Sequence, residues 1–159
     1  MASTSHPNAQ LLERFYAAFA KRDAATMRDC YAPDAMFEDE VFTLKGAEIG
    51  QMWTMLSQNA REFSLQFRDI TADDTSGRAH WEAQYLFSAT GRKVHNIIEA
   101  EFQFRQGLIV MHRDRFDFWS WSRQALGLPG LLLGWSPLIR NKVRAQAARN
   151  LAAFSAKKA

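Results

Sequence analysis

The chain has 159 residues, 47% of them hydrophobic and 13% aromatic, and this composition indicates one folded domain and excludes an intrinsically disordered protein. Its single cysteine, Cys30, excludes an internal disulfide bond and favours a cytoplasmic location. The net charge is +3, but residues 127–159 hold six basic residues and no acidic one, so the basic character belongs to the tail and does not indicate a nucleic-acid-binding domain.

The first sixty residues are predicted to form three helices, with one strand between the second and the third. The first helix begins near Asn8, and its apolar stripe at helical spacing consists of Leu12, Phe15, Tyr16 and Phe19. Asp23 is the expected N-cap of a short second helix, which ends before Pro33. Residues 35–42 are predicted to be a strand that places Phe37, Asp39 and Val41 on one face. The third helix follows Gly46, and its stripe consists of Ile49, Met52, Trp53 and Leu56.

After the third helix the hydrophobic period changes from that of a helix to that of a strand. Alternating apolar residues predict strands at residues 63–67, 81–87, 94–105 and 108–117. Because the connections between the longer strands are short, these strands are expected to form an antiparallel meander. Helices followed by strands indicate an α+β domain, with the helices laid on one face of a curved sheet.

The tail differs in kind from the rest of the chain. Residues 126–137 mix leucines with glycine and proline, so we interpret them as an irregular apolar loop. A basic helix follows, and its apolar side consists of Ile139, Val143, Ala147, Leu151 and Phe154. Three interpretations stay open for this helix: a lid on its own domain, a contact with a partner subunit, or a contact with an anionic membrane. The membrane is the least favoured of the three, because the stripe uses alanine freely.

The most informative stretch runs from Leu108 to Asp117, Leu-Ile-Val-Met-His-Arg-Asp-Arg-Phe-Asp. In a strand, Leu108, Val110, His112, Asp114 and Phe116 share one face, because side chains alternate with period two. A histidine and an aspartate on an apolar face must be hydrogen-bonded or must line a wet pocket. His112 and Asp114 are therefore either a satisfied buried pair that fixes the sheet or an acid/base pair.

Three motifs in this order resemble the nuclear transport factor 2-like superfamily. They are Tyr31-Ala-Pro-Asp-Ala-Met-Phe-Glu-Asp39, then Leu44-Lys-Gly46 before a helix, then the stretch that ends at Asp117. The most similar branch is that of the SnoaL-like and ketosteroid-isomerase-like proteins. The resemblance implies a cone-shaped, cystatin-like α+β barrel over residues 8–127, with a deep apolar pocket and usually a homodimer. Residues 128–159 are then an added segment made of the apolar loop and the C-terminal helix.

The resemblance implies roles for particular residues. Asp39 matches the general base of ketosteroid isomerase, and Glu99 falls where that enzyme keeps a protonated aspartic acid in its oxyanion hole. The tyrosine donor of the isomerase falls at Phe15, which has no hydroxyl group, and the adjacent Tyr16 is turned by about 100° along a helix. An authentic ketosteroid isomerase is therefore not expected.

Two other relatives suggest different chemistry at the last strand. SnoaL-like cyclases use an aspartate there as the acid/base, and this aspartate corresponds to Asp114. Limonene epoxide hydrolase needs an arginine between two carboxylates, whereas Arg113 faces away from Asp114. The fold hosts isomerases, cyclases, hydrolases, dehydratases and binders, so it does not define one reaction.

Further residues are candidates for the pocket wall. His95, Ile97, Glu99 and Glu101 share one face of a strand, and the carboxylates are expected to lie opposite His112 or Asp114. The alternative for Glu99 is a salt bridge across a dimer, and for Asp39 a solvated strand edge. The aromatic candidates for substrate binding, each of which is first a core residue, are Phe15, Tyr16, Trp53, Trp81, Tyr85 and Phe116.

The sequence thus favours a cofactor-independent enzyme that binds an apolar, carbonyl-bearing molecule and moves a proton, as in isomerisation, cyclisation or dehydration. Asp114 with His112 is the expected acid/base pair, and Asp39 and Glu99 are the further carboxylates. A non-catalytic small-molecule binder and a dimeric assembly domain are the alternatives. The histidines have no metal-ligand spacing, and no phosphate loop or nucleotide motif supports a metal, nicotinamide or flavin.

Overall fold

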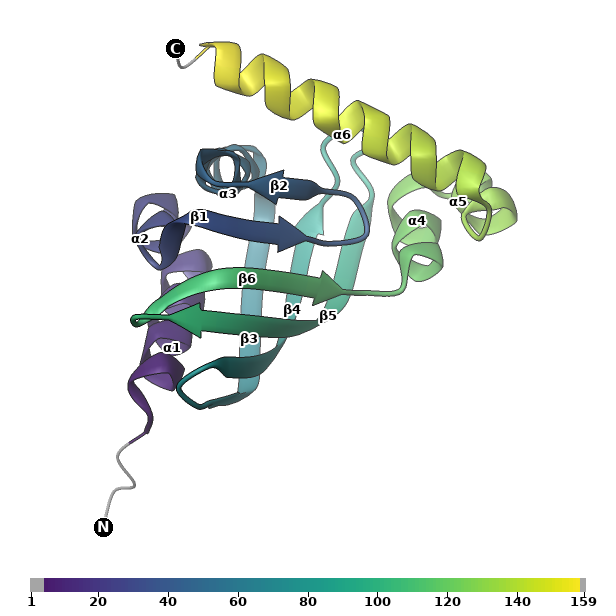
Figure 1. Cartoon of the computed structure of the whole chain (residues 1–159). Helices are drawn as coiled ribbons and strands as arrows, with labels where there is room; N and C mark the ends of the chain where they lie inside the picture. The colour runs from purple at the N-terminus through teal and green to yellow at the C-terminus, as the bar shows by residue number, and fades with distance from the viewer. Residues whose placement is uncertain (1–4, 158–159) are drawn as a thin grey trace.

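Six strands form one curled sheet and six helices surround it in the computed structural model, which describes residues 5–157 (Figure 1). The N-terminal part contains α1 (Pro7–Ala20), α2 (Ala24–Asp29), β1 (Tyr31–Glu38), β2 (Thr43–Lys45) and α3 (Ala47–Asn59). The long strands that follow are β3 (Arg61–Ala72), β4 (Ser76–Leu86), β5 (Lys93–Arg105) and β6 (Leu108–Arg115). The C-terminal part is helical and contains α4 (Phe118–Leu126), α5 (Leu128–Leu133) and α6 (Pro137–Lys157).

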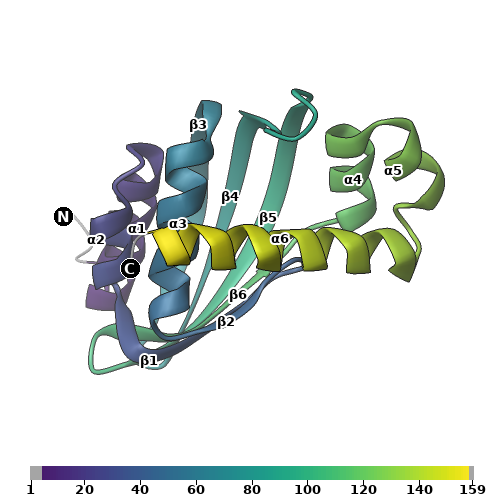
Figure 2. The same ribbon diagram turned by 90° about the horizontal axis from the view of Figure 1, so that it is seen from above.

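The sheet has the strand order β2-β1-β6-β5-β4-β3. Strands β3 to β6 form the expected antiparallel meander, while β1 pairs with β6 in parallel, so the sheet is mixed rather than purely antiparallel. It curls so strongly that β1, β2 and β6 cross in front of β3 and β4 at a steep angle (Figure 1). Helices α1 and α3 lie beside β3 at one end of this curve, and α6 runs across its open side (Figure 2). The predicted α+β architecture is confirmed.

The main core lies between the three N-terminal helices and the concave face of the sheet. All four residues of the first predicted stripe are buried there, and they are Leu12, Phe15, Tyr16 and Phe19. The ring of Phe15 lies edge-on to Tyr31, Trp53 and His112, with centroids 5.7, 5.9 and 5.8 Å away. Edge-to-face contacts of this kind add to the free energy of apolar burial. A cage of aromatic rings therefore surrounds the imidazole of His112.

The N-terminal elements match the sequence-based prediction with one shift. The side chain of Asp23 accepts a hydrogen bond from the backbone N–H of Thr26 at 3.1 Å, as an N-cap does. Strand β1, expected over residues 35–42, instead covers residues 31–38. Asp39 and Val41 therefore lie in the turn between β1 and β2, where their side chains do not follow the alternation of a strand.

Strand β6 departs from strict alternation near its start. Its pairing with β5 shifts between Gln103 and Phe104, so that Met111 and Ile109 face these two consecutive residues. This irregularity at Val110 moves Ile109, rather than Leu108 or Val110, into the fully buried position. His112 and Asp114 follow the irregularity and face the interior, as predicted.

The expected irregular loop over residues 126–137 is wrong, because residues 128–133 form helix α5, which packs closely on α4. A Cβ atom added to Gly130 would lie 1.9 Å from the carbonyl oxygen of Ser122, and one added to Gly134 would lie 2.0 Å from its Oγ. Glycine lets the two backbones approach this closely. The glycines thus serve helix packing here rather than loop flexibility.

Helix α6 docks on its own domain. Leu151 and Phe154 pack against the main core, while Ile139 and Val143 join a second cluster with Phe118. The predicted apolar side of this helix is therefore the side that faces the domain, which is the lid interpretation. Among the described residues 5–157, no helix is long and apolar enough to cross a membrane.

Candidate active site

A cavity of about 960 Å³ opens between the concave face of the sheet, α3 and α6. We call it the central pocket. Its wall is mainly apolar and includes Phe19, Met52, Trp53, Phe63, Ile98 and Phe116. Helix α6 closes part of the opening with Val143, Ala147 and Phe154. A concave apolar site with a few polar groups is the usual form of a small-molecule site.

Asp114 is one of the few polar groups of the central pocket, and its side chain is held from two sides. Its Oδ1 atom accepts hydrogen bonds from Nε1 of Trp81 at 3.3 Å and from Nε2 of His112 at 2.8 Å. The residue is only 3% exposed, so the carboxylate has almost no contact with bulk water. These donors fix the orientation of the carboxylate toward the pocket.

His112 lies behind Asp114 and is completely buried. Its second ring nitrogen, Nδ1, is 2.7 Å from the hydroxyl oxygen of Tyr31, and that oxygen accepts a further bond from Nε1 of Trp53 at 3.0 Å. An ionised Asp114 only accepts, which requires a proton on Nε2 of His112; Nδ1 then accepts from Tyr31. In this tautomer the N–H and O–H groups of Trp53, Tyr31 and His112 each have an acceptor, and the chain of hydrogen bonds ends at Oδ1 of Asp114. His112 is not part of the pocket wall, so it is a positioning residue for Asp114.

Asp39 is the second carboxylate of the central pocket and comes from the turn after β1. Its Oδ1 atom accepts from the backbone N–H groups of Val41 at 2.7 Å and Phe42 at 2.6 Å. Burial, with smaller contributions from the nearby charges of Asp114 and Glu40, raises the pKa of Asp39 from 3.8 to about 7, against the effect of these two hydrogen bonds. A carboxyl group with this pKa exists in both protonation states at neutral pH, as a general acid/base requires.

Two hydrogen-bond donors accompany the carboxylates. The hydroxyl of Tyr85 accepts from Nε1 of Trp121 at 2.9 Å, and its own proton has no acceptor among the described residues. Burial raises the pKa of Tyr85, and the charge of Asp39 adds to this effect. Asn96 is 9% exposed, lines the pocket, and its side-chain amide makes no hydrogen bond within residues 5–157. Both side chains are thus available to a polar atom of a bound molecule.

The prediction for Glu99 and His95 is wrong. Glu99 pairs with Arg115 and Ala100 with Asp114, so Glu99 lies on the sheet face opposite to Asp114. Its side chain is 68% exposed and binds Nδ1 of His80, while His95 binds Glu82 at 2.8 Å on the same outer face. Side chains of a strand alternate between its two faces, so a wrong choice of the buried face misplaces every residue. Strand β5 buries its more apolar face, which consists of Val94, Asn96, Ile98, Ala100, Phe102 and Phe104.

Asn96 is a pocket residue outside the sequence-based prediction, although the pattern of β5 contains a signal for it. Asn96 alternates with Val94, Ile98 and Ala100, which form the more consistently apolar parity of the strand. A count of apolar residues on each face would have placed it inside. The titratable residues on the other face, which include His95 and Glu99, suggested the opposite orientation.

The aromatic candidates divide into two groups. Trp53, Trp81, Tyr85 and Phe116 line the central pocket. Phe15 and Tyr16 do not; they are buried in the core beneath it and are 0% and 1% exposed. The hydroxyl of Tyr16 is buried without a hydrogen-bond partner among the described residues, and burial raises its pKa. No tyrosine therefore supplies the isomerase-type donor from α1.

Cationic side chains surround the opening of the central pocket. Arg22 follows α1, while Lys142, Arg149 and Lys157 belong to α6. The interior, in contrast, holds the carboxyl groups of Asp39 and Asp114. A bound molecule thus meets positive charge at the opening and carboxyl groups at the base.

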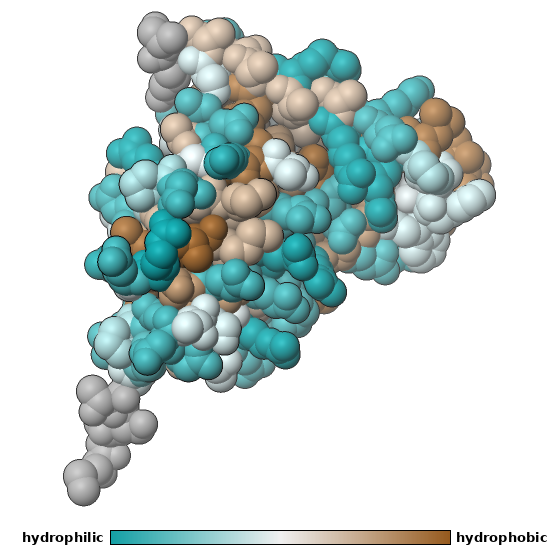
Figure 3. Space-filling model, viewed as in Figure 1, coloured by the Kyte–Doolittle hydropathy of each residue, from teal (hydrophilic) through white to brown (hydrophobic). Residues whose placement is uncertain are grey.

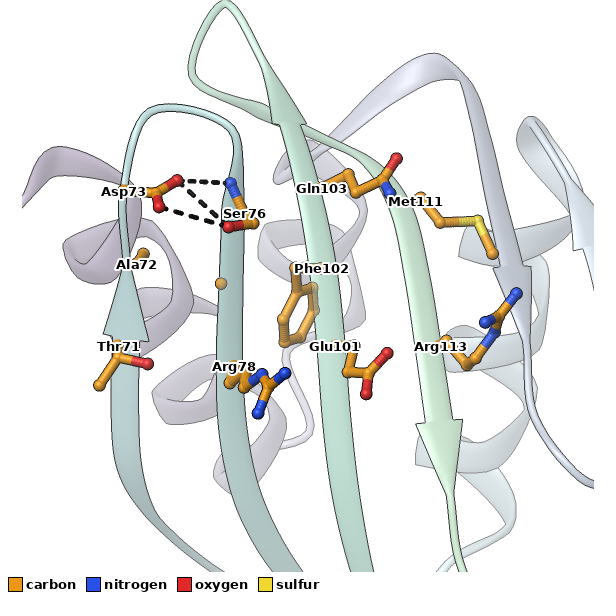
Figure 4. Close-up of a pocket in the computed structure, with 11 residues that line it drawn as sticks. Thr71, Ala72, Asp73, Ser76, Arg78, Glu101, Phe102, Gln103, Met111 and Arg113 are labelled. Atoms are coloured by element: carbon orange, nitrogen blue, oxygen red, sulfur yellow. Dashed lines mark hydrogen bonds between the residues drawn. The ribbon is translucent and has the colours of Figure 1, made fainter.

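A second hollow of about 450 Å³ lies on the sheet near the β3–β4 turn (Figure 4). Asp73 in its wall is already engaged, because its Oδ1 accepts from the backbone N–H groups of Thr75 at 2.9 Å and Ser76 at 2.8 Å. Arg113 also lines this hollow and pairs with Glu38 at 3.5 Å, on the side away from Asp114. The prediction that Arg113 and Asp114 face opposite ways is confirmed. No arginine of β6 therefore reaches the two carboxyl groups of the central pocket.

Within the described residues, no group of three or more His, Cys, Asp and Glu side chains is placed to hold a metal ion. Among the polar groups that line the central pocket, two carboxyl groups (Asp39 and Asp114), a phenol (Tyr85) and an amide (Asn96) come from separate parts of the fold. This set can accept, donate and transfer protons, and it offers two carboxyl groups to a bound molecule.

Comparison with known proteins identifies the family. The family model of the SnoaL-like domain matches residues 12–112. The chain belongs to the SnoaL-like family. The matched region begins within α1 and ends at His112 in β6, so it includes Asp39 but stops two residues before Asp114, and it does not include α6.

Solved structures show the nuclear transport factor 2-like fold for this SnoaL-like protein. A hypothetical protein with a ketosteroid isomerase-like fold from Catenulispora acidiphila, in complex with trimethylamine, has a TM-score of 0.67 at 14% identity, covering 84% of this chain and 100% of its own. An LEH-like epoxide hydrolase from M. tuberculosis has 0.64 at 19% identity, covering 79% and 95%. A putative polyketide cyclase from Xanthomonas campestris has 0.63 at 21% identity, covering 74% and 96%. A search of curated proteins found no significant match.

Proposed function

We propose that this SnoaL-like protein is a cofactor-independent enzyme that transfers a proton on an apolar, carbonyl-bearing small molecule. The observation that supports this most is the pair of carboxyl groups, Asp39 and Asp114, in one apolar pocket, with the pKa of Asp39 raised to about 7. General acid/base groups work best when their pKa lies near the operating pH. A putative polyketide cyclase is among the similar structures, and this supports the same class of chemistry.

The proposed step begins with ionised Asp39 as the base. Its carboxylate takes a proton from a carbon next to the substrate carbonyl. The electron pair of that C–H bond becomes the C=C bond of an enolate, and the π electron pair of the carbonyl moves to the carbonyl oxygen. Tyr85 and Asn96 donate hydrogen bonds to the enolate oxygen, which stabilises charge that develops in the transition state. The protonated carboxyl of Asp39 then gives the proton to carbon. Delivery to another carbon of a conjugated enolate moves the double bond and is an isomerisation, while return to the same carbon gives proton exchange alone.

Asp114 has a separate role in this proposal. Because His112 and Trp81 hold its carboxylate, it is oriented for a second proton transfer, as cyclisation or dehydration requires. Its charge also helps to raise the pKa of Asp39. His112 acts through Asp114 and does not touch the substrate.

Deuterium incorporation tests the proposal without knowledge of the natural substrate. The protein is incubated in D₂O with a panel of apolar ketones, and NMR follows exchange of the protons next to the carbonyl. We expect exchange above background for at least one ketone, and a loss of about 10²–10⁴-fold in Asp39→Asn, the usual contribution of a general base. Asp114→Asn should lower the exchange as well, with the fold intact. Exchange that neither variant affects would contradict the assignment.

A non-catalytic binding role is the second candidate. The large and mostly apolar wall of the central pocket favours it, as does the complex of the Catenulispora acidiphila protein with trimethylamine. In that case ligands bind without chemical change, and Asp39→Asn and Asp114→Asn alter affinity alone. Calorimetry with ketones that bind but show no deuterium exchange would favour the binding role.

A further inference from the structure

Six large apolar side chains are exposed together on α5 and the start of α6. We call them the leucine–tryptophan patch, and it consists of Leu128, Leu131, Leu132, Leu133, Trp135 and Leu138. Trp135 is 73% exposed and Leu128 66%. The space-filling view shows hydrophobic residues gathered at the end of the molecule where α5 lies (Figure 3). The other exposed large apolar residues, Met36, Leu56 and Ile97, belong to different elements. A contiguous patch of this kind marks an interaction surface.

The fold holds these side chains outward. Helix α5 presents Gly130 to Ser122 of α4, at a distance that leaves no room for a larger side chain. With glycine on the inner face, the leucines are left on the outer face, where Leu128, Leu131 and Leu132 are neighbours on successive turns. Nε1 of Trp119 donates to the carbonyl oxygen of Leu131 at 3.2 Å, which ties α5 to α4. Folding therefore presents the patch instead of burying it.

The charged residues of the segment that holds the patch are all basic. Residues 118–159 contain seven basic residues and no acidic one. Arg123 precedes the patch, and Lys142 and Arg144 follow it on exposed positions of α6. One acidic residue of another element reaches this region, since Glu40 lies 3.7 Å from Arg140 in an ion pair. A partner surface should thus carry negative charge in its outer layer and be apolar beneath that layer.

The combination of exposed apolar side chains and nearby basic residues distinguishes the candidate partners. A second copy of the same patch would bring two sets of basic residues together, which costs free energy. The surface of an anionic bilayer offers both complements, because leucine and tryptophan enter the boundary between headgroups and acyl chains while lysine and arginine contact the phosphates. The one polar group of the Trp135 indole is satisfied within the protein, because its Nε1 donates to the carbonyl oxygen of Leu132 at 2.9 Å, so the ring can enter this boundary without an unpaired donor.

We propose that the leucine–tryptophan patch docks this protein on the surface of an anionic lipid bilayer. In this arrangement α5 and the start of α6 lie in the interface plane, and no segment crosses the membrane. The proposal does not depend on the reaction in the central pocket, because the patch lies outside that pocket's wall.

Co-sedimentation with vesicles tests the proposal. The full chain is mixed with vesicles of phosphatidylcholine and phosphatidylglycerol in equal parts, and separately with phosphatidylcholine alone. We expect binding to the anionic vesicles that weakens as added salt shortens the Debye length from about 10 Å to about 3 Å. Binding to phosphatidylcholine alone should be much weaker. Equal binding to both vesicle types, or to neither, would overturn the proposal.

A double variant and a matched control locate the contact. Leu132→Gln with Trp135→Gln removes two exposed side chains of the patch and should weaken vesicle binding by about tenfold or more. Ile97→Gln replaces a side chain that is 53% exposed on the outer face of the sheet, and it should bind as the wild type does. Circular dichroism checks that both variants are folded.

Self-association is the competing outcome. If gel filtration shows a concentration-dependent dimer that Leu132→Gln with Trp135→Gln abolishes, and the wild type does not bind vesicles, the patch is a contact between two copies and the proposal is wrong. If the double variant binds vesicles as tightly as the wild type, another surface carries the binding and the proposal is also wrong.

Discussion

At the scale of single residues, Asp39 and Asp114 are distinguished by the donors around them. Asp114 accepts side-chain donors from Trp81 and His112, while Asp39 accepts only backbone N–H groups through one oxygen atom. The turn after β1 therefore fixes Asp39 in position without bringing a cation to it. This absence of a cation within the described contacts is the reason that burial dominates its pKa.

The raised pKa of Asp39 predicts a pH dependence of stability. Its pKa is about 7 in the fold and ~3.9 in an unfolded chain, so between these values the folded state holds a proton that the unfolded state releases. Stability from this group is thus present at low pH and falls as the pH rises from about 4 to about 7. Asp39→Asn should remove this slope. At about pH 8 the variant should be more stable than the wild type by on the order of 2 kcal/mol, less than the full pKa shift would give, because water screens a partly exposed side chain.

Urea unfolding across this pH range measures the effect, and Asp34→Asn is the matched control. Asp34 is exposed and bonded to Arg105 at 2.6 Å, and this partner lowers the pKa of Asp34. Its contribution therefore changes only below about pH 4, and Asp34→Asn should keep the wild-type slope above that pH. The interpretation fails if Asp39→Asn shows the same slope as the wild type.

The hydrogen-bond chain behind Asp114 predicts a contrast between two buried tyrosines. Tyr31→Phe leaves Nδ1 of His112 and Nε1 of Trp53 without their partner, which should destabilise the fold by about 1–3 kcal/mol. Tyr16→Phe removes a hydroxyl that has no partner among the described residues, so it should be neutral or stabilising. Chemical denaturation of both variants measures the difference. Equal losses would contradict the assigned network.

At the scale of secondary structure, α6 presents one side to the domain and the other to solvent. Leu151 is 6% exposed and Leu138 is 58% exposed, although both are leucines of the same helix. Leu151→Ala should cost about 2–5 kcal/mol, because it opens a cavity against the main core. Leu138→Ala should change stability by less than about 0.5 kcal/mol. Thermal and urea unfolding measure both; similar values would mean that α6 does not dock in solution.

The elements also show which parts of the fold the sequence predicts. Local signals were sufficient for α1, α2 and α3, where apolar stripes and the Asp23 cap act within one helix, and for the meander, where turns separate alternating strands. The prediction of which face of β5 is buried is wrong, because apolar residues occur on both faces and the titratable residues lie on the outer one. Helix α5 was missed, because its glycines are explained only by the contact with Ser122 of α4.

The sequence predicts only part of the candidate site, because local patterns report which face of a strand a residue occupies but not its contacts with distant elements. His112 and Asp114 follow from the alternation of one strand, and their inward orientation is confirmed. The hydrogen bonds from Tyr31 and Trp81 join strands that are distant in the sequence, so no local pattern reports them. The raised pKa of Asp39 likewise depends on the burial that the whole fold creates.

At the scale of the whole molecule, charge is distributed unevenly between two regions. Residues 118–159 carry seven basic and no acidic residues, so the rest of the chain holds 13 basic and 17 acidic residues. Helix α6 brings part of the basic segment over the opening of the central pocket, where Lys142, Arg149 and Lys157 join Arg22. A field of one sign at a pocket opening raises the local concentration of oppositely charged molecules and their association rate.

This asymmetry predicts a salt-dependent association rate for anionic apolar ligands. Two fluorescent probes of similar shape provide a matched test: anilinonaphthalene sulfonate is anionic, and N-phenylnaphthylamine is neutral. Stopped-flow fluorescence should show that added salt slows association of the sulfonate by about tenfold or more, because salt screens charges at the opening, while the neutral probe changes little. The measurement is made on Leu132→Gln with Trp135→Gln, so that the exposed patch does not compete with the pocket. Equal salt dependence for the two probes would show that the basic segment does not act on ligand entry, and α6 would then matter to the pocket only as an apolar cover.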